Sequence, residues 1–586
     1  MFRVTVDGAE RWAGPGQTAA SLLLAQGCAS WRTTRGGRPR GVFCGIGVCH
    51  DCLVAVNGVP DVRACRRVLA AGDRVETQAG ARLPDGPRGP SAGARRDVAA
   101  PVAVIGAGPA GMAAALAAAG AGTRVVLVDD GERPGGQFHR RAADGPDRVA
   151  AVRAVQDHPR IEWLPECAVW ALERADAGDA ADNGAAPDGG WTVHALQGPA
   201  DAAGRTAYTL RAAALVLCTG AYDRALPFPG WELPGVVTAG AAQALAKGQR
   251  TAVGRRVVVS GTGPFLLPVT ASLLTVGADV LGVYEAGSPA GWLRAPVTAL
   301  RDGRGKLPEL LAYGAGLARH RVPYRTRSAV VAAHGNDRVE AVTVARLAAD
   351  WRVLPGTERR IEGVDALCVG YGFLPQLELA LAAGCALRDR TWVAVGAWQQ
   401  TSVPGVYAAG EPTGVGGAAL AAAEGGLAGL AAARWTGAGG VADPAPAIRR
   451  VRAGRRFARL LATAHPVRPG WRTWPDEDTL VCRCEEVPYR ALCADAGPEA
   501  DGMRAFKLAT RVGLGPCQGR VCARNAAELR GAGPLPDPQT ADRRPIAQPV
   551  RLADLAAGAA PGPDTEPHAE PPVPPPATPP YREEPT

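Results

Sequence analysis

The sequence has few lysines and few aromatic residues, and it starts without a secretory signal. Only three of its 65 basic residues are lysines, so the formal net charge of +9 rests on arginine. The arginines are scattered rather than gathered in one stripe, which argues against a nucleic-acid partner. The first sixteen residues lack a charged stretch followed by an apolar one, so we expect a cytoplasmic protein.

The sequence also gives little sign of a membrane span. Residues 101–122 form its one long apolar stretch, about the length that crosses a bilayer. Three glycines within it, Gly106, Gly108 and Gly111, have the spacing of a nucleotide-binding turn, so we expect a strand, a turn and a helix instead. The 14 cysteines indicate metal or redox chemistry, because structural disulfides are rare in the cytoplasm.

A first group of cysteines has the spacing of an iron–sulfur site. Its members follow at C-x4-C-x2-C and then twelve residues on: Cys44, Cys49, Cys52 and Cys65. The spacing of the first three cysteines matches a plant-type ferredoxin loop. Gly45 and Gly47 give the loop the freedom to turn its amides toward the cluster sulfurs. The alternatives are buried free thiols or a zinc site, which more often uses two close pairs; we favour a 2Fe–2S cluster.

A glycine-rich turn predicts a dinucleotide site. Residues 102–111 read VAVIGAGPAG, and the turn itself comprises Gly106, Gly108, Pro109, Ala110 and Gly111. An alanine-rich helix and a second apolar strand follow, and Asp129 ends that strand. Such a turn places helix amides against a pyrophosphate, and the acid can accept hydrogen bonds from ribose hydroxyls. The motif alone leaves FAD and NAD open.

Three later segments resemble the two-dinucleotide-domain flavoproteins and favour FAD. They contribute, in chain order, Gly135, Gly136, Gln137, Thr219, Gly220, Gly410 and Glu411. In these flavoproteins the late acid contacts the flavin ribityl chain and is mostly Asp, so Glu411 is a departure. Three polar residues after the Thr-Gly turn, residues 222–224, are expected in a surface loop.

A second glycine motif is degenerate. Gly261 and Gly263 are present, but Leu266 stands where a third glycine would allow close packing of helix and strand. Glu285 ends the following strand and could bind a ribose. The unit either binds NAD(P) weakly or is a retained scaffold, and we favour the scaffold.

A second group of cysteines lies near the C-terminal end. A C-x-C pair and a C-x4-C pair are separated by 32 residues: Cys482, Cys484, Cys517 and Cys522. Two close pairs can also form a zinc site, so spacing alone does not decide the metal. The surrounding GPCQGRVC resembles the bacterioferritin-associated-ferredoxin-like domains fused to several dehydrogenases. That resemblance implies a second 2Fe–2S cluster.

These observations predict a multidomain α/β fold. We expect a two-dinucleotide-binding-domain flavoprotein: a Rossmann-like FAD domain with an inserted NAD-like domain, a β-grasp-like 2Fe–2S domain before it and a small helical bacterioferritin-associated-ferredoxin-like domain after it. The predicted segments are the first 2Fe–2S domain at 1–82, a linker at 83–98, the FAD domain at 99–225 and 365–445, the NAD-like domain at 226–364, a connecting region at 446–475, the second 2Fe–2S domain at 476–532 and a disordered Pro-rich tail at 533–586.

Residues 1 to about 530 together resemble one family. It comprises the alpha subunits of bacterial opine oxidases, hydrogen cyanide synthase and proline or hydroxyproline dehydrogenases, here with the small N-terminal 2Fe–2S component fused on. The chain is also similar to part of the alpha chain of sarcosine oxidase. The resemblance implies a subunit of an FAD-dependent oxidoreductase that works beside a D-amino-acid-dehydrogenase-like flavoprotein, the beta subunit. That partner oxidises the amine or amino-acid substrate, and this chain passes the electrons on. No catalytic residue is assigned here, because the cofactors carry the chemistry.

Two other functions fit parts of the sequence. A stand-alone NAD(P)H-dependent flavin and iron–sulfur reductase would use Gly261, Gly263 and Glu285. A non-catalytic iron–sulfur interaction or scaffold protein would hold the metal but no flavin. Reduction of the flavin by NADH supports the first, and purified protein without flavin supports the second.

Overall fold

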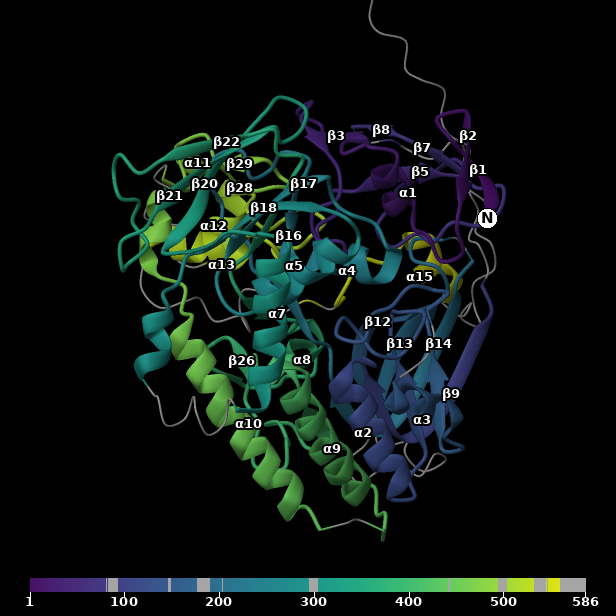
Figure 1. Cartoon of the computed structure of the whole chain (residues 1–586). Coiled ribbons are helices and arrows are strands. Elements are labelled where there is room, and N and C mark those ends of the chain that lie inside the picture. Colours follow the sequence, from purple (N-terminus) through teal and green to yellow (C-terminus); the bar gives the residue numbers. More distant parts are fainter. Residues whose placement is uncertain are drawn as a thin grey trace, which may run out of the picture.

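The computed structural model describes residues 1–80, 82, 93–145, 149–175, 190–202, 204–294, 304–440, 443–493, 503–531, 544 and 546–558. Figure 1 shows the N-terminal sheet, the two larger sheets and the C-terminal helices packed into one body. In the part of the chain that the structure describes, no helix is both long and apolar enough to cross a bilayer.

The N-terminal unit is a five-stranded mixed sheet. Its order is β2 (Ala9–Ala13), β1 (Phe2–Val6), β7 (Arg74–Glu76), β5 (Leu53–Val56) and β6 (Val59–Arg63). Only the central β1–β7 pair is parallel. Helix α1 (Ala19–Ala25) begins after Thr18, whose hydroxyl caps it, and buries Leu22 and Leu23. A small sheet completes the unit: β4 (Pro39–Arg40), β3 (Arg32–Thr33) and β8 (Gln78–Ala79). This arrangement agrees with the predicted β-grasp-like architecture.

The second sheet has seven strands and carries the intact glycine turn. Its order is β11 (Ile161–Leu164), β10 (Val125–Val128), β9 (Arg95–Ile105), β14 (Thr206–Leu217), β13 (Trp191–Gln197) and β12 (Cys167–Arg174), with β27 (Val406–Ala408) also on β14. Its helices are α2 (Pro109–Gly120), α3 (Ala150–Asp157) and α9 (Gly417–Trp435). Helix α9 lies close against α2 because Gly425 and Gly429 face it: a Cβ there would stand 1.9 Å from Ala110 O and 2.1 Å from Ala114 O.

The third sheet is parallel throughout. Its order is β16 (Val236–Thr238), β23 (Ala366–Gly370), β17 (Arg256–Gly261), β18 (Asp279–Glu285) and β19 (Tyr324–Thr326). Around it lie α4 (Ala239–Gln249), α5 (Leu266–Thr275), α7 (Leu307–Arg319) and the antiparallel strands β20 (Ser328–His334), β21 (Ala341–Arg346) and β22 (Arg359–Glu362). Strand β23 lies beyond residue 364, so the inserted fold extends further than predicted.

Short elements connect these sheets to the C-terminal unit. They are β15 (Ala221–Asp223), η1 (Pro289–Arg294), η2 (Arg304–Lys306), β24 (Phe373–Pro375), α8 (Glu378–Ala382), β25 (Leu387–Arg388), β26 (Trp392–Val393) and η3 (Glu411–Thr413). The C-terminal elements are α10 (Ala445–Ala464), η4 (Pro469–Thr473), β28 (Leu480–Cys482), β29 (Val487–Pro488), α11 (Tyr489–Cys493), α12 (Met503–Thr510), α13 (Ala523–Arg530) and α15 (Leu552–Gly558).

Two predicted boundaries differ from the structure. Strand β9 begins at Arg95, inside the predicted linker, because residues 95–100 continue the pairing with β14. Part of the predicted disordered tail is ordered: Ala547 N donates to Trp170 O at 2.7 Å, and Asp554 pairs with Arg205 at 2.8 Å. These contacts fix residues 546–558 against the seven-stranded sheet, while much of the remaining tail lies outside the described residues.

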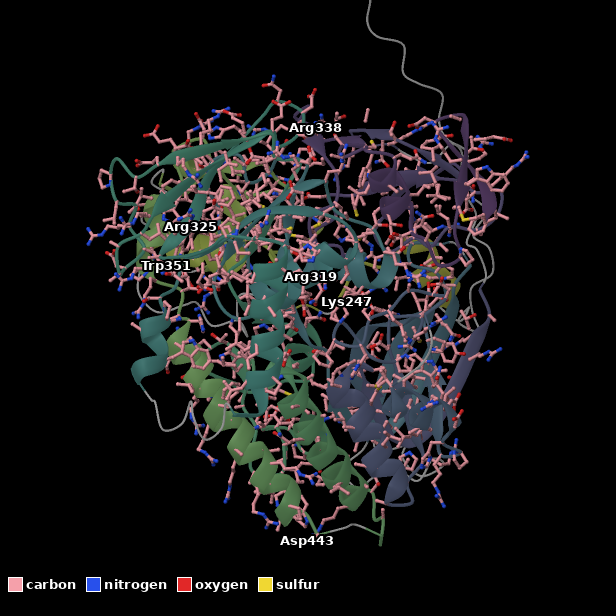
Figure 2. The ribbon with its side chains drawn as sticks, viewed as in Figure 1. Lys247, Arg319, Arg325, Arg338, Trp351 and Asp443 are labelled. Atoms are coloured by element: carbon pink, nitrogen blue, oxygen red, sulfur yellow. The ribbon has the colours of Figure 1, made fainter. Side chains whose placement is uncertain are left out.

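The positive charge is spread over many elements, as expected. Figure 2 labels Arg319 on α7, Arg325 on β19 and Arg338 in the turn before β21, three exposed arginines on separate elements. Lys247 lies on α4, near the middle of the view.

Candidate functional site

The glycine turn after β9 opens the N-terminus of α2 to a cavity. Gly106 has φ +101°, and a Cβ there would lie 2.3 Å from Cys218 O; a Cβ on Gly111 would lie 1.6 Å from Gly106 O. These two glycines therefore allow the backbone to close on itself. Gly108 has no atom within 4 Å of a Cβ position. It leaves open space beside the helix N-terminus, where backbone amides favour an anion.

Asp129 holds the turn from the neighbouring strand. Its carboxylate accepts hydrogen bonds from Ala107 N at 2.6 Å and Gly131 N at 2.7 Å. Burial, with a smaller contribution from Asp130, raises the pKa of this carboxyl to about 6. Gly135 N donates to Ala107 O at 2.8 Å, so the Gly135-Gly136 segment lies directly against the turn.

Glu411 lines the same space. One carboxylate oxygen accepts from Gly417 N at 3.1 Å, while Oε2 is buried and has no partner. Burial raises the pKa of Glu411 to about 7. The preceding Gly410 N donates to Glu424 at 3.0 Å, and Arg455 donates to the other oxygen of Glu424 at 2.8 Å. Glu424 thus fixes the backbone that positions Glu411.

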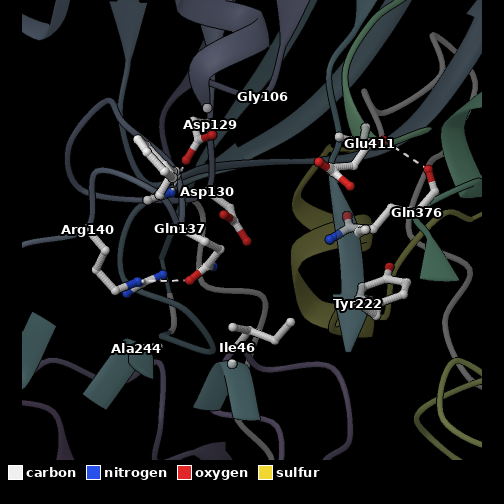
Figure 3. Close-up of a pocket in the computed structure, with 18 of the residues that line it drawn as sticks. Ile46, Gly106, Asp129, Asp130, Gln137, Arg140, Tyr222, Ala244, Gln376 and Glu411 are labelled. Atoms are coloured by element: carbon white, nitrogen blue, oxygen red, sulfur yellow. Dashed lines mark hydrogen bonds between the residues drawn. The ribbon is translucent and has the colours of Figure 1, made fainter. Parts of the chain in front are cut away.

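All but two of the predicted cofactor residues line one cavity of about 1220 Å³. The two exceptions, Gly111 and Gly135, shape the turn behind it. Figure 3 shows Asp129, Gln137 and Glu411 facing a common space, with Ile46 on its opposite side. A cavity of this size, with an open glycine at a helix N-terminus and an unpaired carboxylate oxygen, fits a dinucleotide such as FAD.

The first cysteine group forms part of the cavity wall. Gly45, Ile46, Gly47 and Val48 line it, as does Cys65. The cysteine-bearing loop therefore lies directly beside the space that the flavin residues enclose.

The loop turns backbone amides toward the first group of sulfurs, as predicted. Cys44 Sγ accepts from Val48 N at 3.3 Å and from Cys49 N at 3.4 Å. Burial raises the pKa of Cys44, but hydrogen bonds from the Cys49 and Cys65 thiols and from the backbone amides of Ile46 and Cys49 outweigh it and hold the pKa well below its ordinary value. Cys65 in turn contacts Cys52. The four buried thiols thus form one set, which fits an iron–sulfur cluster.

The second cysteine group also comes together from its two distant pairs. The Sγ distances are 3.8 Å from Cys482 to Cys484, 3.6 Å from Cys484 to Cys517 and 3.7 Å from Cys522 to Cys482. Hydrogen bonds from Cys484 and Cys522 lower the pKa of Cys482 to about 4. A set of four thiols with a low-pKa member can hold iron or zinc.

Comparison with known proteins supports both cofactor types. Residues 100–437, more than half of the chain, match the model of the pyridine nucleotide-disulphide oxidoreductases, and residues 1–80 match a 2Fe–2S iron–sulfur cluster binding domain. The A subunit of opine oxidase from Agrobacterium tumefaciens is 34% identical over 494 residues, which cover 77% of this chain and 90% of that protein. The HcnB subunit of hydrogen cyanide synthase from Pseudomonas protegens is 31% identical over 444 residues, 72% and 89% of the two chains.

The chain belongs to the family of HcnB and the opine oxidase A subunit. The predicted family, the flavoprotein character and the N-terminal 2Fe–2S domain are thereby confirmed. The crystal structure of L-proline dehydrogenase from P. horikoshii shares the fold, with a TM-score of 0.64 at 19% identity over 94% of this chain and 97% of that one.

In this relative of HcnB, side chains of the protein itself contact the second glycine turn and the acid that would bind NAD(P). Glu285 is buried and accepts from Thr262 Oγ1 at 2.8 Å, Gly263 N at 2.9 Å and Gly287 N at 2.8 Å. His465, at the end of α10, lies over Gly263, 3.8 Å from its Cβ position. The two amide contacts of Glu285 match those of Asp129 in the first site. What differs is that Thr262 also donates to the carboxylate and His465 covers the turn, which favours the scaffold interpretation.

The polar residues after the Thr-Gly turn were predicted wrongly as a surface loop. Tyr222 and Arg224 are buried. Tyr222 shares hydrogen bonds with Glu378 and Arg520, and Arg224 pairs with Glu528 at 2.7 Å. Both partners from the C-terminal unit lie about 300 positions further along the chain. No local pattern marks such contacts, although Arg520 stands between two predicted metal ligands.

Proposed function

We propose that the chain is the electron-transfer subunit of an enzyme that oxidises an amine or amino acid. The names of its relatives, which are subunits of opine oxidase and hydrogen cyanide synthase, describe parts of larger enzymes. The proposed partner is a D-amino-acid-dehydrogenase-like flavoprotein, the beta subunit, that binds and oxidises the substrate. This chain would accept the electrons and pass them on. The thirteen cysteines whose side chains the structure describes form no disulfide, which supports a cytoplasmic location.

The observation that carries this proposal is the shared cavity. Gly108, Asp129 and Glu411 would hold FAD on one side, and Ile46 and Cys65 of the cluster loop lie on the other. FAD, when bound, exchanges electrons in pairs or singly, whereas a 2Fe–2S cluster takes one at a time. The protein's contribution is to hold both groups against one enclosed space.

We propose that the second cysteine group also binds a 2Fe–2S cluster. Backbone amides support it as they support the first: Gly513 N donates to Cys482, and Val521 and Gly519 donate to Cys517. Amides of this kind tune a cluster's potential. Iron, sulfide and zinc analysis separates the two metals: four irons and four sulfides per chain support the proposal, and two irons with one zinc contradict it.

The proposed role in a larger enzyme is tested by reconstitution. The chain is purified alone and together with a candidate beta subunit, a D-amino-acid-dehydrogenase-like flavoprotein from the same organism, and dye reduction is followed with proline, sarcosine and an opine. We expect turnover only with both proteins. Turnover by the chain alone, or a complex that oxidises no amine, contradicts the proposal.

The rival reductase function is tested with the same preparation. NADH or NADPH is added anaerobically to the purified chain, and flavin absorbance is followed. Because His465 lies over Gly263 and Thr262 also donates to Glu285, we expect no reduction on the time scale of turnover. Rapid bleaching of the flavin by NADH overturns the scaffold interpretation.

A further inference from the structure

One arginine joins the two cysteine groups. Arg483 stands between Cys482 and Cys484, and its side chain reaches into the loop of the first group. Its Nε donates to Asp51 Oδ2 at 2.9 Å, and Nη2 lies 2.8 Å from the same oxygen. The side chains of Arg483 and Asp51 are 5% and 2% exposed, so little solvent screens this ion pair.

Aromatic contacts hold the guanidinium in place. Its central carbon lies 3.8 Å from the ring centre of Phe43 and 4.9 Å from that of Trp231. Phe43 directly precedes Cys44. Residues beside metal ligands of the first group therefore contact a residue that lies between metal ligands of the second. Phe43, Cys44, Cys482 and other residues of both groups belong to one buried apolar cluster.

The surrounding charges are balanced before any metal is added. Arg40 lies 4.0 Å from Asp51 and 3.4 Å from Glu486, and Arg38 lies 3.9 Å from Glu486 and 3.2 Å from Glu232. Three arginines therefore face three carboxylates. Removing Arg483 makes this buried region more negative by one unit, and neutralising Asp51 makes it more positive by one unit. Each change acts at close range on both cysteine groups, because the same pair touches both loops.

We propose that Arg483 is a positioning residue that sets the reduction potentials of both cysteine-bound sites together. The inference rests on the proposed second 2Fe–2S cluster. Reduction adds an electron to a cluster, and a buried positive charge stabilises the reduced form, since charges interact strongly in a medium of low dielectric constant. Arg483 should therefore raise the reduction potentials of both sites, and Asp51 should lower them.

The test is a redox titration of the intact holoprotein followed by electron paramagnetic resonance. We expect Arg483→Gln to lower both midpoint potentials and Asp51→Asn to raise both. Arg483→Lys, which keeps the charge, should stay closer to the wild type than the glutamine variant. Arg511→Gln is the matched control: Arg511 is a mostly exposed arginine of the same unit, paired with Glu485, and its loss should shift neither potential.

The outcomes separate this inference from the proposed function. Two opposite shifts, each seen in both signals, support it, because a purely structural disturbance would not change sign between the two variants. Four irons per chain with a shift in only one signal, or in neither, overturn the inference and leave the proposed electron-transfer function intact. Zinc in the second site overturns both the second cluster and this inference. If Arg483→Gln loses metal, the comparison of Asp51→Asn with Arg511→Gln still decides.

Discussion

The carboxyl group of Glu411 should make flavin affinity depend on pH. Its side chain lines the cavity, its Oε2 has no partner, and burial raises its pKa to about 7. We expect a ribityl hydroxyl of FAD to donate to this carboxylate, which favours the ionised form. Binding then lowers the pKa of Glu411, so affinity must increase as pH rises through the pKa of the free protein.

The size of the effect follows from the ionised fraction. A carboxyl with a pKa of about 7 is roughly one-tenth ionised at pH 6 and nine-tenths ionised at pH 8. If the ionised form alone binds, the Kd of FAD falls about tenfold over this range, about 1.4 kcal/mol. Asp129, whose pKa is about 6, adds a further factor of about two if its ribose contact also needs the charge.

The assay is a fluorescence titration of FAD into the deflavinated protein at pH 6 and pH 8. Glu411→Gln should bind FAD more weakly at pH 8 and show only the residual twofold dependence. Asp129→Asn should remove that twofold part and keep the tenfold one. A wild-type Kd that is flat between pH 6 and pH 8, or an unchanged slope in Glu411→Gln, refutes the reasoning.

Four further substitutions test the site and its support. Gly108→Ala has room for its Cβ, so the deflavinated protein should keep its Tm while its affinity for FAD falls. Gly111→Ala places its Cβ 1.6 Å from a carbonyl oxygen. This variant should lose about 3 kcal/mol or more of stability, measured by thermal unfolding. Cys65→Ser should remove the iron of the N-terminal site, read as one lost resonance signal, while the C-terminal site keeps its metal. Arg455→Ala should lower the free energy of unfolding in denaturant by about 2 kcal/mol, because it leaves buried Glu424 without its cation. The value is below that of a fully buried pair because Arg455 is partly exposed. Unchanged stability would show that the pair contributes little.

Sequence reasoning succeeded where a motif encodes a backbone conformation. The turn at Gly106 requires a positive φ and a close approach of backbone, and only glycine permits both, so the pattern could be read directly. The two cysteine groups could also be predicted, because the spacing of cysteines within a loop determines whether their sulfurs can bind one metal site. Glu411 could be placed by resemblance, but its unpaired oxygen could not.

The rest depended on contacts between distant segments. Tyr222 is buried because Arg520, far along the chain, packs and hydrogen-bonds against it. Strand β23 joins the third sheet rather than the second because it pairs with β17. His465 covers the degenerate glycine turn from the end of α10, and no local pattern marks that position. The ordered segment 546–558 was missed for the same reason: its composition resembles the tail, and its anchors are Trp170 on β12 and Arg205 just before β14.

The cavity wall joins segments that are far apart in the sequence. Residues 547–550 line the same cavity as Ile46 and Glu411. The wall is therefore complete only when this segment and the N-terminal unit have both docked. Detachment of either one would open the space that the predicted flavin residues enclose.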